Sequence, residues 1–308
     1  MAIFKINNSK LETISEKKID LERDIQKLTE DNLETIFGLK FICTEFQLNG
    51  LRIDTLAYDE ESKSFVIIEY KRDRSFSVID QGFAYLSLML NNKADFILEY
   101  NEKMNNNLKR DDIDWSQSRV LFIAQSFTTH QQNAIEFKDL PIELWEVQKY
   151  ENETILYNQL KSADSYESIK TISKSETVEN VSKQIKKYSI EDHFKLNWNE
   201  SRKLFDVFNE KILGEFSDLK INIVKSIIDY KLGNKVLIYL HALKSGPWLT
   251  FSRSRPEDFN DPEKRVHYDK NSMKFYNQHT SSFQIKSAED IDYAIMLTKQ
   301  AYKRLKEK

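Results

Sequence analysis

L-R-I-D-T-L-A-Y-D-E-E-S-K-S-F-V-I-I-E-Y-K, residues 51–71, has the pattern of a β-hairpin. Residues 51–58 alternate apolar and polar side chains, residues 59–64 form a polar turn, and residues 65–68 are an apolar run rich in β-branched side chains. Because side chains alternate between the two faces of a strand, Glu69 and Lys71 share one face. The hairpin is expected to bring Asp54 to them at one end of a sheet. Charges at the end of a buried strand are costly unless they are paired or bind a metal, so this position indicates chemistry.

Two carboxylates and a lysine in this arrangement suit a divalent metal site with a proton-handling group beside it. Asp54 and Glu69 supply the hard oxygen ligands that Mg²⁺ or Mn²⁺ prefers. The metal would lower the pKa of a bound water, and Lys71 would position or deprotonate that water or stabilise charge on a phosphate. The alternative is a surface hairpin with an ion pair between Glu69 and Lys71. The D…ExK pattern alone favours that alternative.

Three further residues shift this balance toward chemistry. Glu34 lies on a predicted helix before the sheet, where its neighbours Leu33, Ile36 and Phe37 face inward, and it could join the metal ligands. Its alternative is an ordinary exposed helix glutamate. Gln81 and Tyr85 are four residues apart on the helix predicted after the hairpin, so they share one face and could orient Lys71 or hold a phosphate.

The apolar periodicity predicts a mixed β-sheet flanked by helices. Two helices are expected within residues 11–40, ending at Gly38, and a tight turn at Asn49-Gly50. Further elements are expected as helices over 77–90, 130–137, 198–213 and 288–305, and as strands over 41–46, 94–98, 119–124, 142–150, 235–241, 248–253 and 283–285, with a strand-like or mixed stretch over 217–230.

Composition and length predict a globular protein of two domains. The chain has 308 residues, of which 40% are hydrophobic and 31% charged. It shows no apolar run long enough to span a bilayer and no signal peptide, so no membrane partner is expected. Its one cysteine, Cys43, allows no internal disulfide, and a cytoplasmic location is expected.

Charge is divided unevenly along the chain. Residues 1–155 carry a net charge of −9 and residues 156–308 one of +6, although the whole chain has a net charge of only −3. Residues 160–190 are rich in Ser, Thr, Lys and Glu and predict a solvated linker or a partly helical connector. The expected organisation is a first domain at 1–155, a linker at 156–188, and a smaller α+β domain at 189–308 whose charge suits a polyanion.

Two groups of basic residues are candidate nucleic-acid contacts. Arg72 and Arg74 follow the hairpin and could contact phosphates, or they could pair with Asp73 and Asp80 in solvent. In the C-terminal domain, cations are interleaved with Trp248 and Phe251, although for these two aromatic residues a place in the core is favoured. These C-terminal cations are Arg253, Arg255, Lys264 and Arg265.

The motifs L-E-x-x-F, L-R-I-D-T-L, I-I-E-Y-K-R and Q-G-F-A-Y, over about residues 30–100, resemble the PD-(D/E)xK nuclease superfamily. The resemblance is to its RecB-like branch, which has a QxxxY element, and to NucS-type endonucleases. It implies metal-dependent phosphodiester hydrolysis with catalytic roles for Glu34, Asp54, Glu69 and Lys71, supported by Gln81 and Tyr85. Ile53 stands where the motif has proline. The C-terminal half resembles a domain of unknown function called DUF5655, which supplies no catalytic residues.

The sequence favours a Mg²⁺- or Mn²⁺-dependent nuclease acting on DNA. The alternatives are a nucleic-acid-binding or assembly module that keeps the fold without turnover, and a purely structural protein. The five histidines have no zinc-binding spacing, and no nucleotide-binding or serine-esterase motif is present. The sequence leaves open whether the substrate is DNA or RNA, its form, and whether the protein is a homodimer.

Overall fold

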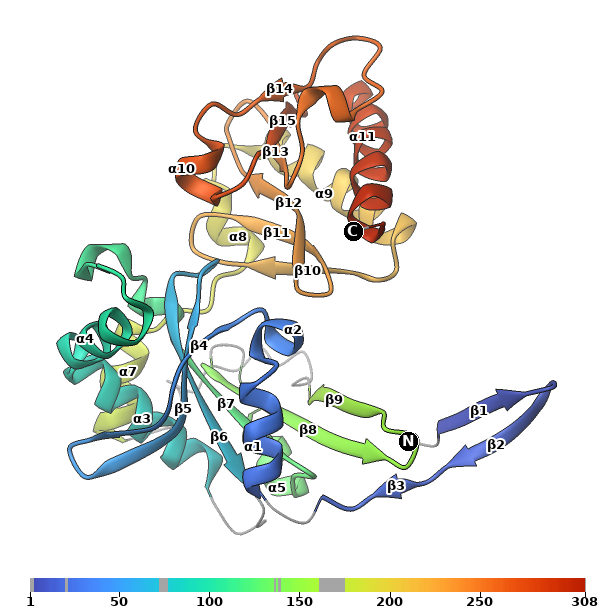
Figure 1. The fold of residues 1–308 in the computed structure, drawn as a ribbon. Helices are drawn as coiled ribbons and strands as arrows, with labels where there is room; N and C mark the ends of the chain where they lie inside the picture. Colours follow the sequence, from blue (N-terminus) through green and yellow to red (C-terminus); the bar gives the residue numbers. More distant parts are fainter. Residues whose placement is uncertain are drawn as a thin grey trace. The chain divides into compact units, whose positions relative to one another are not determined.

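The computed structural model describes residues 3–19, 22–71, 77–135, 137, 140–160 and 175–307. The chain divides into two compact units, residues 1–187 and 188–308 (Figure 1). No helix within the described ranges is long and apolar enough to cross a membrane.

A mixed seven-stranded sheet forms the centre of the first unit. Its strand order is β3-β8-β7-β6-β5-β4, and β9 also pairs with β8. Strands β6, β7 and β8 are parallel and the other pairs antiparallel. The strands are β3 (Glu16–Lys17), β4 (Lys40–Leu48), β5 (Leu51–Asp59), β6 (Ser64–Lys71), β7 (Arg119–Ala124), β8 (Ile142–Tyr150) and β9 (Ile155–Leu160).

Helices cover both faces of this sheet (Figure 1). On one face, α3 (Val78–Asn91) and α4 (Lys93–Met104) pack on side chains such as Leu56 and Ile67, and α7 (Glu176–Gln184) packs against α3. On the other face, α1 (Glu22–Glu30) and α2 (Leu33–Phe37) pack on Ala57 and Ile68. The short helix α5 (Thr129–Ala134) follows β7. The apolar runs of β6 and β7 are buried because both of their faces are covered.

The turns that position the predicted hairpin form as expected. Asn49 and Gly50 have φ angles of 49° and 80°, which the tight turn between β4 and β5 requires. Ser77 caps α3 by accepting from the amide of Asp80, and Gly38 ends α2 in the left-handed conformation.

Three segments of the first unit differ from the sequence prediction. Residues 3–14 form an antiparallel hairpin, β1 (Ile3–Asn7) and β2 (Lys10–Ile14), so the expected helix does not begin at residue 11. The predicted strand at 94–98 lies inside helix α4. The segment 156–188, expected to be a linker, contains most of β9 and all of α7, and Val178 and Val181 of α7 join the core. The first unit therefore extends beyond residue 155.

The second unit is a six-stranded antiparallel sheet with the order β10-β11-β12-β13-β15-β14. Helices α9 (Asn199–Glu215) and α11 (Glu289–Lys306) contribute Phe205, Phe208 and Leu297 to its core, where Phe251 is also fully buried. The remaining elements are β10 (Leu219–Ile223), β11 (Ile228–Leu232), β12 (Lys235–His241), β13 (Trp248–Phe251), β14 (His267–Tyr268), β15 (Ser281–Gln284), α8 (Ile190–His193) and α10 (Ser272–Tyr276). The molecule thus has the expected fold class, a mixed sheet flanked by helices with a smaller α+β unit.

Candidate metal and phosphodiester site

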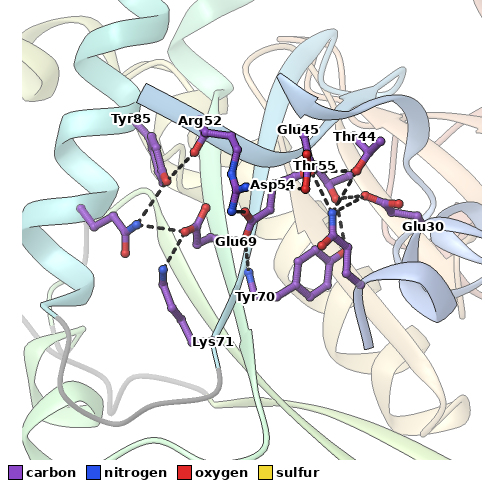
Figure 2. Close-up of polar contacts among 12 residues, drawn as sticks. Glu30, Thr44, Glu45, Arg52, Asp54, Thr55, Glu69, Tyr70, Lys71 and Tyr85 are labelled. Carbon is purple, nitrogen blue, oxygen red and sulfur yellow. Dashed lines mark hydrogen bonds and ion pairs between the residues drawn. The ribbon is translucent and has the colours of Figure 1, made fainter. Parts of the chain in front are cut away.

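Strands β5 and β6 separate where the predicted acidic residues lie. Their register runs from Asp59–Ser64 to Thr55–Ile68, and no further pair is formed toward Asp54. Asp54, Glu69 and Lys71 have the strand parity of Leu56 and Ile67, so they face α3. Figure 2 shows Asp54 and Glu69 side by side at this end of the sheet.

The Asp54 carboxylate takes the place of a strand carbonyl. The backbone N–H of Tyr70 donates to Asp54 Oδ2 at 3.1 Å, although it lies beyond the last β5–β6 pair. The other oxygen, Oδ1, is 3.9 Å from an Arg52 guanidinium nitrogen. Asp54 is 8% exposed, so its charge is largely removed from water.

The two carboxylate oxygens of Glu69 differ in their hydrogen bonding. Oε1 accepts from Lys71 Nζ at 2.7 Å and from Gln81 Nε2 at 3.0 Å. Oε2 is buried and has no hydrogen-bond partner. A buried acceptor without a partner is costly, and a cation ligated at this oxygen would remove that cost.

Helix α3 supplies the polar pair that the spacing predicted. Gln81 Nε2 lies 3.2 Å from the Tyr85 hydroxyl, which donates to the carbonyl of Arg52 at 3.0 Å. Burial and the nearby charge of Glu69 raise the pKa of Tyr85, so its hydroxyl stays protonated. The pair therefore ties α3 to Glu69 and to β5 (Figure 2).

The electrostatics of the two acids also fit a cation. Burial, followed by the charge of Glu69, raises the pKa of Asp54 from 3.8 to about 6. The hydrogen bond from the Tyr70 amide and the charges of Lys71 and Arg52 act in the opposite direction. A divalent cation between two such carboxylates would offset their repulsion.

Glu34 does not join this cluster. Its side chain is exposed on α2, whose Leu33 packs against the opposite face of the sheet. Within the described part of the chain, no group of three or more His, Cys, Asp or Glu side chains is placed to hold a metal ion. The structure therefore does not bring Glu34 to Asp54 and Glu69, and two carboxylates remain that could serve as hard oxygen ligands for a divalent cation.

Residues that the spacing did not single out reach Asp54 from the other face. Gln26 of α1 donates to the carbonyl of Asp54, and Glu30, four residues later, accepts from Gln26 and from Thr55 Oγ1. The spacing also did not predict that the Arg52 carbonyl accepts a hydrogen bond from the Tyr85 hydroxyl. Their only sequence signal is the i, i+4 spacing of Gln26 and Glu30, which does not specify a partner strand.

The predicted nucleic-acid contacts belong to two other segments of the chain. Arg72 and Arg74 fall outside the described residues. In the second unit, Arg253, Arg255 and Lys264 are exposed. The Arg265 guanidinium, in contrast, pairs with Asp290 and stacks on Phe283 and Tyr293 at 4.8 and 5.0 Å. Much of the hydrogen-bonding capacity of Arg265 is therefore used within its own unit.

The chain thus has a mixed-sheet domain with paired carboxylates and a lysine at the end of two neighbouring strands. It is 38% identical over 305 residues to a protein of Haemophilus influenzae (strain Rd) described as uncharacterized, and this match covers 98% of the chain and 100% of the other protein. The chain belongs to the same family as that protein. No protein-family model matches it.

Three solved structures have local similarity to the chain. A repair endonuclease from Pyrococcus abyssi is 17% identical with a TM-score of 0.25, over 43% of this chain and 49% of that one. An EndoMS–dsDNA complex is 18% identical with a TM-score of 0.25, over 42% and 47%. Pyrococcus furiosus SfsA with Ca²⁺ is 13% identical with a TM-score of 0.23, over 49% and 76%. The chain thus spans less than half of the two endonucleases, and similarity this low does not define a shared activity.

Proposed function

We propose that the first unit is a metal-dependent nuclease that hydrolyses phosphodiester bonds, with DNA as the favoured substrate. The observation that carries this proposal is the state of Glu69: Oε2 is buried without a partner beside Asp54, while Oε1 binds Lys71 and Gln81. A purely structural ion pair has no need of a second buried carboxylate with a raised pKa next to it.

In this proposal, Asp54 and Glu69 hold Mg²⁺ or Mn²⁺. The bound cation supplies Lewis-acid chemistry, which lowers the pKa of water and offsets negative charge on a phosphate. The Lys71 ammonium is held at the cluster by Glu69 and can neutralise charge on a phosphate oxygen or donate a hydrogen bond to the attacking water. Gln81 and Tyr85 hold Glu69 and the β5 backbone in position, and this limits rearrangement during the reaction.

Cleavage assays with matched variants test this proposal. Plasmid, single-stranded DNA and RNA are incubated with wild-type protein and Mg²⁺ or Mn²⁺, with EDTA as the metal-free control. Glu69→Gln and Lys71→Met are expected to lower the cleavage rate by at least about 100-fold. The ion pair Lys40–Glu60, at 2.5 Å in the same unit, provides the matched controls Lys40→Met and Glu60→Gln, which should cleave like wild type. Failure of the wild-type protein to cleave any of these substrates with either metal would overturn the proposal.

One observation favours the second candidate, a binding module without turnover. Glu34 does not complete a three-acid site, so the donor set has two side chains. Nucleic-acid binding that weakens with salt, persists in Lys71→Met and is never followed by hydrolysis would support this candidate.

A further inference from the structure

The backbone of β5 is unpaired on both sides at Asp54. The register of β4 on β5 passes from Thr44–Thr55 to Phe46–Ile53 and omits Asp54. Its partner position, Glu45, has a φ angle of 52°, which turns the β4 backbone away. On the other side, the pairing with β6 ends at Thr55. The strand ladder therefore has no pair at the residue that presents the candidate carboxylate, although Ile53 and Thr55 on either side of it are paired with β4.

Side chains replace the missing ladder contacts. Gln26 Nε2 donates to the Asp54 carbonyl at 3.1 Å, and Thr44 Oγ1 does so at 3.4 Å. The amide of Tyr70 donates to the carboxylate of the same residue. Gln26 thus holds the backbone of Asp54 from the α1 face, while Tyr70 holds its side chain.

The orientation of the Gln26 amide is itself determined. Its Nε2 lies 3.0 Å from Glu30 Oε1 and 3.0 Å from Thr44 Oγ1, in addition to the Asp54 carbonyl. Glu30 accepts a second hydrogen bond from Thr55 Oγ1, the residue after Asp54. Because carboxylate and carbonyl oxygens accept hydrogen bonds, the nitrogen end of Gln26 must point to β5. Figure 2 shows Glu30, Thr44 and Thr55 on the side of the strand away from Tyr85.

We propose that Gln26 is a positioning residue for Asp54: by holding the Asp54 carbonyl from α1, it fixes where the carboxylate points at an unpaired position of β5. This proposal rests on the proposed function for its consequence, which is the affinity of the cation site. Its structural part concerns the metal-free protein. Loss of a contact that orients a metal ligand typically lowers metal affinity by about 10- to 100-fold.

The test compares Gln26→Met with Gln132→Met. Methionine keeps the length and the helix propensity of glutamine but removes the donor. Gln132 Nε2, on helix α5, also donates to a backbone carbonyl, that of Phe127, at 3.1 Å, and therefore provides a matched control. Gln26→Glu is a second variant without an amide donor, for use if Gln26→Met does not fold.

Amide hydrogen exchange at Tyr70 in EDTA is the metal-free measurement. Gln26→Met is expected to speed this exchange by about tenfold or more, because the Asp54 carboxylate that accepts from the Tyr70 amide becomes mobile. In an Asp54→Ala background, Gln26→Met should change the exchange rate of the Tyr70 amide by less than about twofold. Unchanged exchange in Gln26→Met, or an equal change in Gln132→Met, would overturn the proposal.

Calorimetric titration with Mn²⁺ gives the metal-dependent measurement. Gln26→Met should weaken Mn²⁺ binding by about tenfold, with Gln132→Met close to wild type. Equal affinities in wild type and Gln26→Met would contradict the positioning role even if the nuclease proposal holds. If wild-type protein binds no Mn²⁺, the nuclease proposal fails, and the exchange experiment still decides whether Gln26 orients Asp54.

Discussion

The carboxyl group of Asp54 is buried beside Glu69, and its pKa is raised from 3.8 to about 6. A raised pKa means that the folded protein binds the proton more tightly than the unfolded chain does. The stability that this group contributes is therefore present below about pH 4 and is lost as the pH rises through about 6. Ionised Asp54 destabilises the metal-free protein at neutral pH.

Asp54→Asn removes this cost and keeps an acceptor for the Tyr70 amide. In EDTA at pH 7.5 the variant should be more stable than wild type by about 1–2 kcal/mol, and the gain should shrink as the pH falls from 6 to 4. Urea unfolding of both proteins at several pH values measures this difference in the free energy of unfolding. A variant that is less stable than wild type at pH 7.5 would show that the ionised carboxylate is stabilising.

Spacing along the chain predicted the residues of the site that lie on one hairpin and one helix face. Asp54, Glu69 and Lys71 follow from strand alternation, and Gln81 and Tyr85 from the i, i+4 rule. Glu34 and Gln26 show the limit of this approach. Which turn of a helix contacts a strand depends on the packing of the two elements, and periodicity alone does not specify it.

Helix α3 approaches the sheet closely at Gly82, the residue after Gln81. A Cβ atom there would lie 2.5 Å from Ile142 Cδ1 and 2.9 Å from Ile142 Cγ1. Gly82→Ala gains helix propensity of about 1 kcal/mol but must displace Ile142, so a net loss of stability of about 1–2 kcal/mol is expected. Ile142→Val removes the Cδ1 atom that a Cβ at position 82 would meet. In urea unfolding, the double variant should therefore lose less unfolding free energy than the two single variants lose together. Strict additivity would contradict this packing.

The hairpin of β1 and β2 has an apolar face that is largely exposed. Phe4, Ile6 and Leu11 are 46%, 75% and 65% exposed, and Ile6 pairs directly with Leu11. Lysine at both positions 6 and 11 should change the free energy of unfolding by less than about 1 kcal/mol, because little contact is lost. Leu56→Lys in the core is the contrasting variant and should lose several kcal/mol. A large loss in the hairpin variant would show that this face is covered in solution.

Two segments form an element of another type than the one predicted: residues 94–98 are helical, and residues 11–14 belong to a strand. Within residues 94–98, Phe96 is buried and Leu98 is 58% exposed, and the inward positions continue at Tyr100, a helical spacing that a five-residue window hides. Leu11 and Ile14 have helical spacing too, but Asn8 and Ser9 take φ angles of 48° and 64° and reverse the chain there. Strands β7 and β8 were predicted with their observed bounds, because β7 is an apolar run buried on both faces and β8 alternates apolar and polar residues.

At the scale of the whole molecule, each unit has its own core. The cluster that contains Phe205, Tyr230 and Phe283 is formed entirely by residues after 188. Residues 188–308 expressed alone should therefore unfold cooperatively in urea, as an independent domain does. A gradual, non-cooperative transition would show that this unit needs the first one. Whether the exposed cations of the second unit bind nucleic acid can then be measured on it directly.

The proposed function requires that Asp54 and Glu69 together hold a divalent cation. Crystals soaked in Mn²⁺ and measured at a wavelength where manganese scatters anomalously test it most directly. An anomalous peak is expected within ligand distance, about 2.0–2.5 Å, of a carboxylate oxygen of each residue, including Glu69 Oε2. The peak should be absent in crystals of Glu69→Gln. A wild-type crystal with manganese bound elsewhere, and none between these two carboxylates, would show that Asp54 and Glu69 are not a cation site.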